Sequence, residues 1–153
     1  MKVLIKNQQK LTKIKRDSAA LLRLLGLKDA ELSILFVNDG RMKELNHKYR
    51  GIDRTTDVLS FPQQERSAFS VQRSATFNFQ LSTFNFMLGD IVINLQAAKR
   101  QAPEHGLSFN EELRWLLVHG VLHLIGYDHE RSKYAERKMR TKERELLEYI
   151  SKL

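Results

Sequence analysis

The chain is organised around residues 108–129, which read S-F-N-E-E-L-R-W-L-L-V-H-G-V-L-H-L-I-G-Y-D-H. Ser108 and Glu111 form the S-x-x-E pattern of a capping box, which satisfies two backbone amides at a helix start. The following residues are apolar on most sides of such a helix, and a helix of that kind belongs in the interior. Gly126 stands where a left-handed residue ends a helix. We therefore expect a buried central helix that stops just before Gly126.

Three of the chain's five histidines lie in this stretch, at His119, His123 and His129. A spacing of four residues puts the first two on one helix face, one turn apart. A reversal of the chain at Gly126 then allows His129 to return towards them. Three neutral imidazoles suit zinc and leave a fourth position for water, whose pKa the ion lowers to about 7. The pattern predicts a metal site, although a lone buried histidine is more often a hydrogen-bonded core residue.

The spacing also fits the zinc-peptidase motif H-E-x-x-H-x-x-G-x-x-H, except that Gly120 replaces the glutamate. Because that glutamate is the general base of the peptidases, its absence argues against peptide hydrolysis. A phosphodiester carries its own negative charge, and an arginine can offset the charge that builds up on its oxygens. Gly120 allows close backbone approach, clears space near the metal, or simply packs tightly.

Strands and helices mix along the rest of the chain. Apolar and β-branched runs predict strands at residues 1–6, 32–37, 58–61 and 88–95. Helical spacing predicts further helices at residues 11–25, after 38–40, after Asn94 and from about Lys133. In the last helix we expect these side chains to face inward: Ala135, Met139, Leu146, Tyr149, Ile150 and Leu153. We predict one α+β domain over residues 1–153, with a small mixed four-stranded sheet, about five helices, and the histidines on the buried central helix.

Composition limits the partners and the compartment. The net charge is +8, from 26 basic and 18 acidic residues. A basic balance favours nucleic acid, although many basic proteins bind none. The absence of cysteine excludes disulfides and Cys-ligated zinc. Since no apolar run approaches a signal-peptide core or a membrane span, we expect a cytoplasmic protein that does not bind membranes.

Residues 63–86 separate the third and fourth expected strands and are rich in Ser, Gln, Asn and Phe. Phe77, Phe79 and Leu81 alternate with polar residues, as on a half-buried strand face. We favour a long hairpin or irregular insertion whose phenylalanines pack on the body. The alternative is an exposed aromatic surface that stacks bases or contacts a partner.

Three motifs follow one another along the chain. They are L-N-H-K-Y-R-G-I-D-R-T-T-D-V-L-S-F-P at 45–62, L-G-D-I-V-I at 88–93, and H-G-V-L-H-L-I-G-Y-D-H at 119–129. In order and spacing they resemble the YbeY family of bacterial metallo-endoribonucleases, from about residue 30 to the C-terminal helix. The resemblance implies a zinc-dependent, single-strand-specific endoribonuclease that acts in rRNA maturation, at the 3′ end of 16S rRNA, and in ribosome quality control.

The resemblance also implies roles for particular residues. It places one zinc ion per chain on His119, His123 and His129, with His119 and Arg50 as catalytic residues. Arg50 lies in the Y-R-G-x-D motif and would be the functional arginine of the cleft, whereas a surface salt bridge at a helix end is the alternative. Single-stranded RNA, rRNA and the ribosome are the implied partners.

Three aspartates lie in or beside the matched motifs. Asp57 and Asp90 either orient histidines from outside the ligand set or brace strand ends; we favour bracing for Asp57 and leave Asp90 open. Asp128 precedes the third histidine and either positions that loop, handles protons, or makes a turn. Two features depart from the family: Thr55 stands where proline is usual, and residues 63–86 are longer and less acidic than expected.

Two other functions stay open. One is a non-catalytic ribosome-assembly factor with a structural zinc, which normally has four protein ligands and would gain its fourth from Asp128. The other is a metal hydrolase of another substrate, such as a peptide. Basic residues of the last helix either steer RNA or form a solvated face with Glu pairs: Lys133, Arg137, Lys138 and Arg140.

Overall fold

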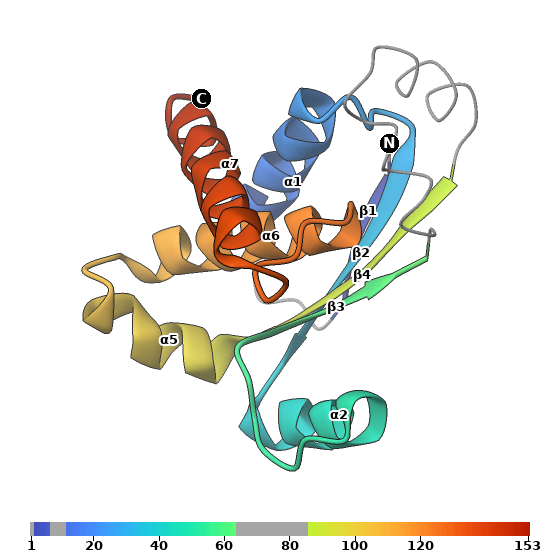
Figure 1. The fold of residues 1–153 in the computed structure, drawn as a ribbon, viewed down its shortest axis with the longest axis vertical. Helices are drawn as coiled ribbons and strands as arrows, with labels where there is room; N and C mark the ends of the chain where they lie inside the picture. The colour runs from blue at the N-terminus through green and yellow to red at the C-terminus, as the bar shows by residue number, and fades with distance from the viewer. Residues whose placement is uncertain (1, 7–11, 64–85) are drawn as a thin grey trace.

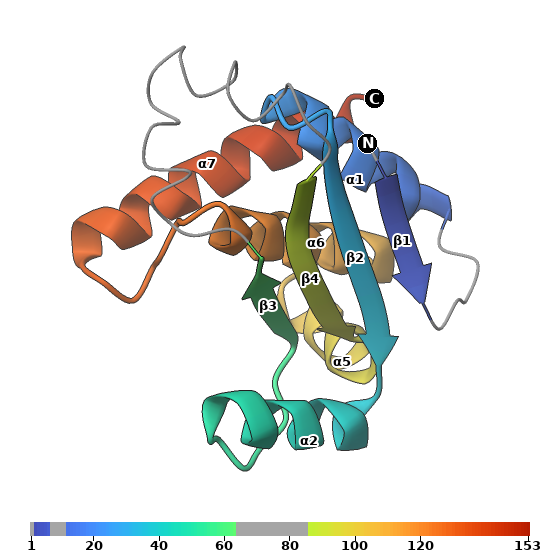
Figure 2. The same cartoon turned by 90° about the vertical axis from the view of Figure 1, so that its right-hand side faces the viewer.

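The computed structural model describes residues 2–6, 12–63 and 86–153. Four strands form one sheet in the order β1-β2-β4-β3 (Figures 1 and 2). Strands β1 and β4 run parallel to β2, and β3 runs antiparallel to β4. The strands are β1 Lys2–Lys6, β2 Ala30–Val37, β3 Val58–Pro62 and β4 Phe86–Asn94. The expected mixed sheet is therefore present. The two interpretations of the 63–86 segment, a packed insertion or an exposed aromatic surface, concern residues 64–85 and lie outside the described residues.

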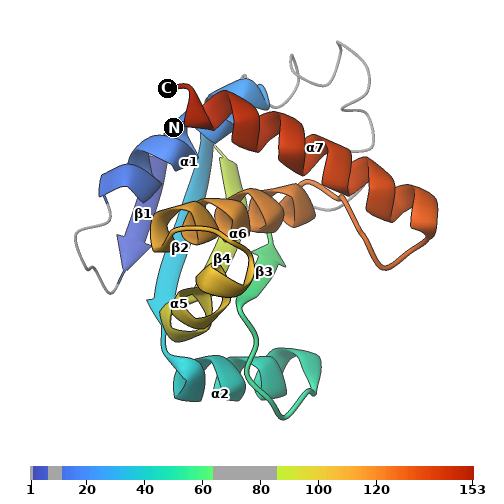
Figure 3. The ribbon, with the colours of Figure 1, turned by 90° about the vertical axis from the view of Figure 1, so that its left-hand side faces the viewer.

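Five helices occur in the described residues, which confirms the α+β class. They are α1 Thr12–Leu24, α2 Asp39–Arg50, α5 Leu95–Glu104, α6 Phe109–Leu124 and α7 Lys133–Ser151. Helices α1, α5, α6 and α7 lie on one side of the sheet, and α2 lies at one end of it (Figures 1 and 3). No described helix is long and apolar enough to span a membrane.

Helix α6 is the buried centre of this arrangement, as predicted. Ser108 and Glu111 form the capping box: the Ser108 hydroxyl accepts from the Glu111 amide at 3.2 Å, and the Glu111 carboxylate accepts from the Ser108 amide at 2.7 Å. At the other end Gly126 has φ +100°. Its amide and that of Tyr127 donate to the carbonyls of His123 and Leu122 at 3.1 and 3.0 Å. These two bonds form the Schellman motif that ends the helix and turns the chain.

The apolar side of α7 differs from the prediction at its C-terminal end. Met139, Leu146 and Ile150 are buried as expected. Tyr149 and Leu153, however, are 56% and 59% exposed, so their predicted inward orientation is wrong. Tyr149 lies about 100° around the helix from Ile150, off the buried stripe, and Leu153 follows the end of the helix.

Gly120 lets α6 lie close against the sheet. A Cβ at this position would come within 3.1 Å of two side-chain carbons of Ile91 and within 3.3 Å of the Ser60 hydroxyl. That hydroxyl also donates to the Gly120 carbonyl at 3.1 Å. Because the Cβ position points to strands β3 and β4, close packing is the interpretation of Gly120 that the structure supports.

Gly120→Ala therefore tests this contact. Alanine gains about 1 kcal/mol of helix propensity, but overpacking a full core costs typically about 1–3 kcal/mol. Ile91 is fully buried in a central strand, so its side chain has little room to move aside. We expect the free energy of unfolding to fall by about 1 kcal/mol in urea titrations, with part of the loss restored in Gly120→Ala/Ile91→Val. A Gly120→Ala protein more stable than the wild type would contradict this account.

A buried carboxylate ties the end of α5 to α6. The Glu112 side chain is inaccessible to solvent, and both its oxygens lie near Nδ1 of His105, at 3.1 and 2.8 Å. The hydrogen bond to Glu112, together with its charge and those of Glu104 and Asp57, raises the pKa of His105 above 6.5. The His105 charge thus compensates the buried Glu112 carboxylate.

This pair predicts a pH dependence of stability. Because the folded-state pKa of His105 is raised, its contribution is fully present below pH 6.5 and declines as pH rises through the folded-state pKa. We expect the difference in unfolding free energy between the wild type and His105→Asn to be larger at about pH 6 than at about pH 9. A difference that stays constant over this pH range would show that the charge of His105 does not contribute to the free energy of unfolding.

Candidate metal centre

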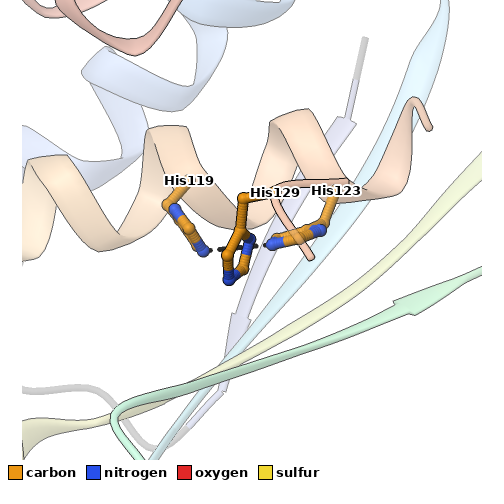
Figure 4. A group of neighbouring side chains, drawn as sticks. All are labelled: His119, His123 and His129. Carbon is orange, nitrogen blue, oxygen red and sulfur yellow. Dashed lines mark hydrogen bonds between the residues drawn. The ribbon is translucent and has the colours of Figure 1, made fainter. Parts of the chain in front are cut away.

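Three imidazoles converge where α6 ends. His119 and His123 project from α6, and His129 reaches them from the loop between α6 and α7 (Figure 4). One ring nitrogen from each residue lies within 4.8 Å of the others, and the Nε2 atoms of His119 and His123 are 3.1 Å apart. The predicted convergence of the three histidines is therefore observed.

The donor set fits a metal ion. Two nitrogens bound tetrahedrally to zinc at 2.0–2.1 Å lie about 3.3 Å apart, close to the 3.1 Å between His119 and His123. Burial, followed by the neighbouring His119 and His129, lowers the pKa of His123 to about 4, so this imidazole is neutral at neutral pH. The buried Nδ1 of His129 has no hydrogen-bond partner among the described residues. The neutral His123 imidazole and the unsatisfied nitrogen of His129 suit a cation.

Glu143 of α7 orients His119. Its carboxylate accepts from Nδ1 of His119 at 2.5 Å and from the indole Nε1 of Trp115 at 3.3 Å. A carboxylate acts as the acceptor in such a bond, so the proton lies on Nδ1 of His119, and Nε2, which faces His123, is the candidate ligand atom. The sequence interpretation missed Glu143, which the apolar stripe could have revealed. Met139, Glu143, Leu146 and Ile150 share a helical spacing, and an acid in such a stripe needs a buried partner.

Arg50 is the last residue of α2 and is exposed. Its side chain makes no hydrogen bond or ion pair within the described part of the chain, so the alternative of a surface salt bridge is not observed there. Nothing ties its side chain to the histidines either. Its catalytic role stays a prediction.

Two of the predicted aspartates make contacts away from the histidine group. The Asp57 backbone carbonyl accepts from the Asn94 amide at 2.8 Å, and the Asn94 side chain donates to the Thr56 carbonyl at 3.2 Å. This network links the loop before β3 to the end of β4, where Asp57 has the position of a brace. On β4, Asp90 accepts from the Gln63 amide group at 3.2 Å.

Asp128 holds the loop that precedes the third histidine. Its carboxylate accepts from the Glu130 amide at 2.9 Å, which closes a local turn around His129. Asp128 does not belong to the group of potential ligands found among the described residues, which consists of the three histidines. The hydrogen bond supports the turn role of Asp128, and the Asp128 charge also acts on His123, whose pKa it raises against the larger effect of burial.

Glu143→Gln tests the orienting contact. Glutamine keeps the size of the side chain but removes the charge, and loss of such a partner typically weakens metal binding about 10–100-fold. We expect the zinc dissociation constant, measured by competition with a chromophoric chelator, to rise within that range. Glu145→Gln is the matched control, since Glu145 is an exposed acid on the same helix. Equal zinc affinities in the two variants would show that Glu143 does not support metal binding.

Comparisons with known proteins place the chain in a family. A family model described as Endoribonuclease YbeY matches residues 2–151. A protein named Endoribonuclease YbeY from Heliobacterium modesticaldum is 46% identical over 103 residues, which are 67% of this chain and 60% of that relative. Its namesake from Caldanaerobacter subterraneus is 40% identical over 161 aligned positions, covering 98% of each chain. A solution structure of a Thermotoga maritima protein has 27% identity and a TM-score of 0.61, over 97% of this chain and 88% of that one. The chain belongs to the endoribonuclease YbeY family.

Proposed function

We propose that residues 1–153 form a single metallo-endoribonuclease domain that cleaves single-stranded RNA. One zinc ion per chain would bind His119, His123 and His129. The observation that carries the proposal is the convergence of three imidazoles without a fourth ligand among the described residues, in a chain whose relatives are named endoribonucleases. As the sequence resemblance implies, its place of action would be rRNA maturation in the cytoplasm, at the 3′ end of 16S rRNA and in ribosome quality control.

The three-histidine donor set favours zinc and a catalytic site. Imidazole nitrogens suit zinc better than magnesium or calcium, which prefer oxygen ligands. A zinc ion with three protein ligands keeps an open position and makes hydroxide available at neutral pH. The chain's own contribution is twofold: burial keeps His123 neutral, and the Glu143 carboxylate orients the His119 ring through its Nδ1.

A phosphodiester substrate agrees with the contacts of two charged residues, Glu143 and Arg50. Glu143 is bound to His119 and Trp115, so it is not placed as the free general base that a peptidase needs. Arg50 is exposed and makes no ion pair within the described residues, so its guanidinium is available for phosphate oxygens. Binding there would offset the negative charge that develops during cleavage.

The two other functions receive less support. A structural zinc normally has four protein ligands, but Asp128 bonds to the Glu130 amide and lies outside the histidine group. A peptide hydrolase would need an acid next to the first histidine, where Gly120 instead packs against Ile91 and Ser60.

Substitution of His119 and Arg50 tests the proposal. His119→Ala removes a ligand and should abolish cleavage of an end-labelled single-stranded RNA. Arg50→Ala should lower kcat/KM about 10²–10³-fold, as loss of a charge-stabilising group typically does. Arg54→Ala is the control, because Arg54 is an exposed arginine four residues further along the chain. Its contact with Asn46 is made by the backbone carbonyl, so the substitution leaves that contact in place.

Circular dichroism should show the wild-type fold in all three proteins. Full cleavage by a folded His119→Ala or Arg50→Ala protein would overturn the assignment of that residue. Cleavage of a peptide that EDTA abolishes, without RNA cleavage, would favour the other metal hydrolase instead.

A further inference from the structure

A hollow of about 490 Å³ lies between α7 and the loop that follows α6. Its volume is within the range of about 300–1,000 Å³ that is usual for ligand-binding clefts. The hollow and the candidate metal centre share the loop after α6, because the lining residue Tyr127 lies two positions before His129 in the sequence. Figure 3 shows how this loop leads from α6 into α7. The side chains that line the hollow include Tyr127, Tyr134, Arg137, Lys138, Lys142 and Glu145.

The charges in the hollow are mostly uncompensated. Lys142 lies 3.5 Å from the Glu145 carboxylate, so these two residues offset one another. The side chains of Arg137 and Lys138 make no ion pair or hydrogen bond within the described part of the chain. Two cations without partners on one wall of a hollow favour an anionic occupant.

The basic residues of α7 thus divide into two groups. Arg140 lies outside the hollow and binds Glu136 at 2.7 Å, one helical turn away. It belongs to the solvated face with Glu pairs that the sequence left open as an alternative. Arg137 and Lys138 belong to the other group and face the hollow.

The aromatic residues indicate the kind of anion. Tyr134 is 68% exposed and makes no ring contact with another aromatic side chain of the described residues. An exposed ring beside cations is the arrangement that binds single-stranded nucleic acid, since unpaired bases stack on the ring while the cations bind phosphates. In a duplex the base faces are covered by their neighbours, and an acidic peptide has no need of the ring.

We propose that this hollow binds a segment of single-stranded RNA and leads it to the histidine group. Arg137 and Lys138 bind its phosphates, and an unpaired base stacks on Tyr134. The inference rests on the proposed function and adds a binding surface to it, outside the metal ligands.

Equilibrium binding separates this surface from the chemistry. A fluorescent single-stranded oligoribonucleotide is titrated with the full-length His119→Ala protein, which cannot cut it, and anisotropy is read at several salt concentrations. In this background we expect Arg137→Gln/Lys138→Gln to weaken binding and to flatten the slope of log K against log salt by about 0.7 per lost phosphate contact. Tyr134→Ala should weaken binding about tenfold with little change in that slope.

Arg140→Gln/Arg144→Gln is the matched control. It removes the same charge from the same helix, but neither residue lines the hollow. We expect it to bind RNA nearly as well as the parent protein, and thermal unfolding monitored by circular dichroism should show that all the variants are folded. A duplex RNA of the same length should bind more weakly than the single strand and should not respond to Tyr134→Ala.

Three results would overturn the inference: no RNA binding by the His119→Ala protein, equal losses in the hollow and control variants, or a duplex that binds as well as the single strand. Tighter binding of polyglutamate than of RNA would also overturn it, in favour of an acidic protein partner. The cleavage assay is separate. If the wild type cleaves RNA while the hollow variants bind like the control, the inference fails and the proposed function stands. If binding depends on the hollow but no RNA is cleaved, the proposed activity fails instead.

Discussion

The close contact of α6 with strands β3 and β4 at Gly120 sets the position of everything else in the site. The glycine brings the helix backbone within reach of the Ser60 hydroxyl and the Ile91 side chain. His119 precedes Gly120 in the chain, and His123 follows His119 by one helical turn. The packing of α6 therefore sets the position of both imidazoles, because the helix cannot shift without opening the core. The position that holds a catalytic acid in the zinc-peptidase motif is here used for packing.

The second constraint is the buried acid of α7. Glu143 lies in the apolar stripe of that helix, where an unpaired carboxylate would cost several kcal/mol. Its bonds to His119 and Trp115 remove that cost and at the same time join α7 to α6. The contact fixes the tautomer of the first histidine and also the position of the helix whose outer surface forms the neighbouring hollow. The Glu143–His119 contact thus links the first histidine of the candidate metal centre to the helix that carries Arg137 and Lys138.

Features that depend on neighbours in sequence were predictable, and features that depend on distant segments were not. The capping box at Ser108, the turn at Gly126 and the convergence of the three histidines all follow from spacings within twenty-two residues. The partnership of Glu143 with His119 joins residues 24 positions apart, and it depends on how two helices pack. The outward orientation of Tyr149, by contrast, follows from local helix geometry, because Tyr149 lies about 100° around α7 from Ile150 and off the buried stripe. Arg50 is the clearest case of a residue that the structure alone would not single out. The family resemblance assigns it a function, whereas its contacts in the described structure indicate none.

The distribution of charge around the histidines bears on the kind of substrate. Of the acids near the group, Glu143 is bound to His119 and Trp115, and Asp128 accepts from the amide of Glu130. Neither has the arrangement of a free general base poised over a neutral peptide. The unpaired cations Arg137 and Lys138 lie on the adjoining α7 surface, and the chain as a whole carries a charge of +8. When the acids of a site are hydrogen-bonded within the protein and nearby cations are unpaired, the site attracts anions. The electrostatic field then raises the local concentration of an anionic substrate before the reaction begins. This arrangement is the one that the proposed phosphodiester substrate requires, in a motif where Gly120 stands at the position of the peptidase glutamate.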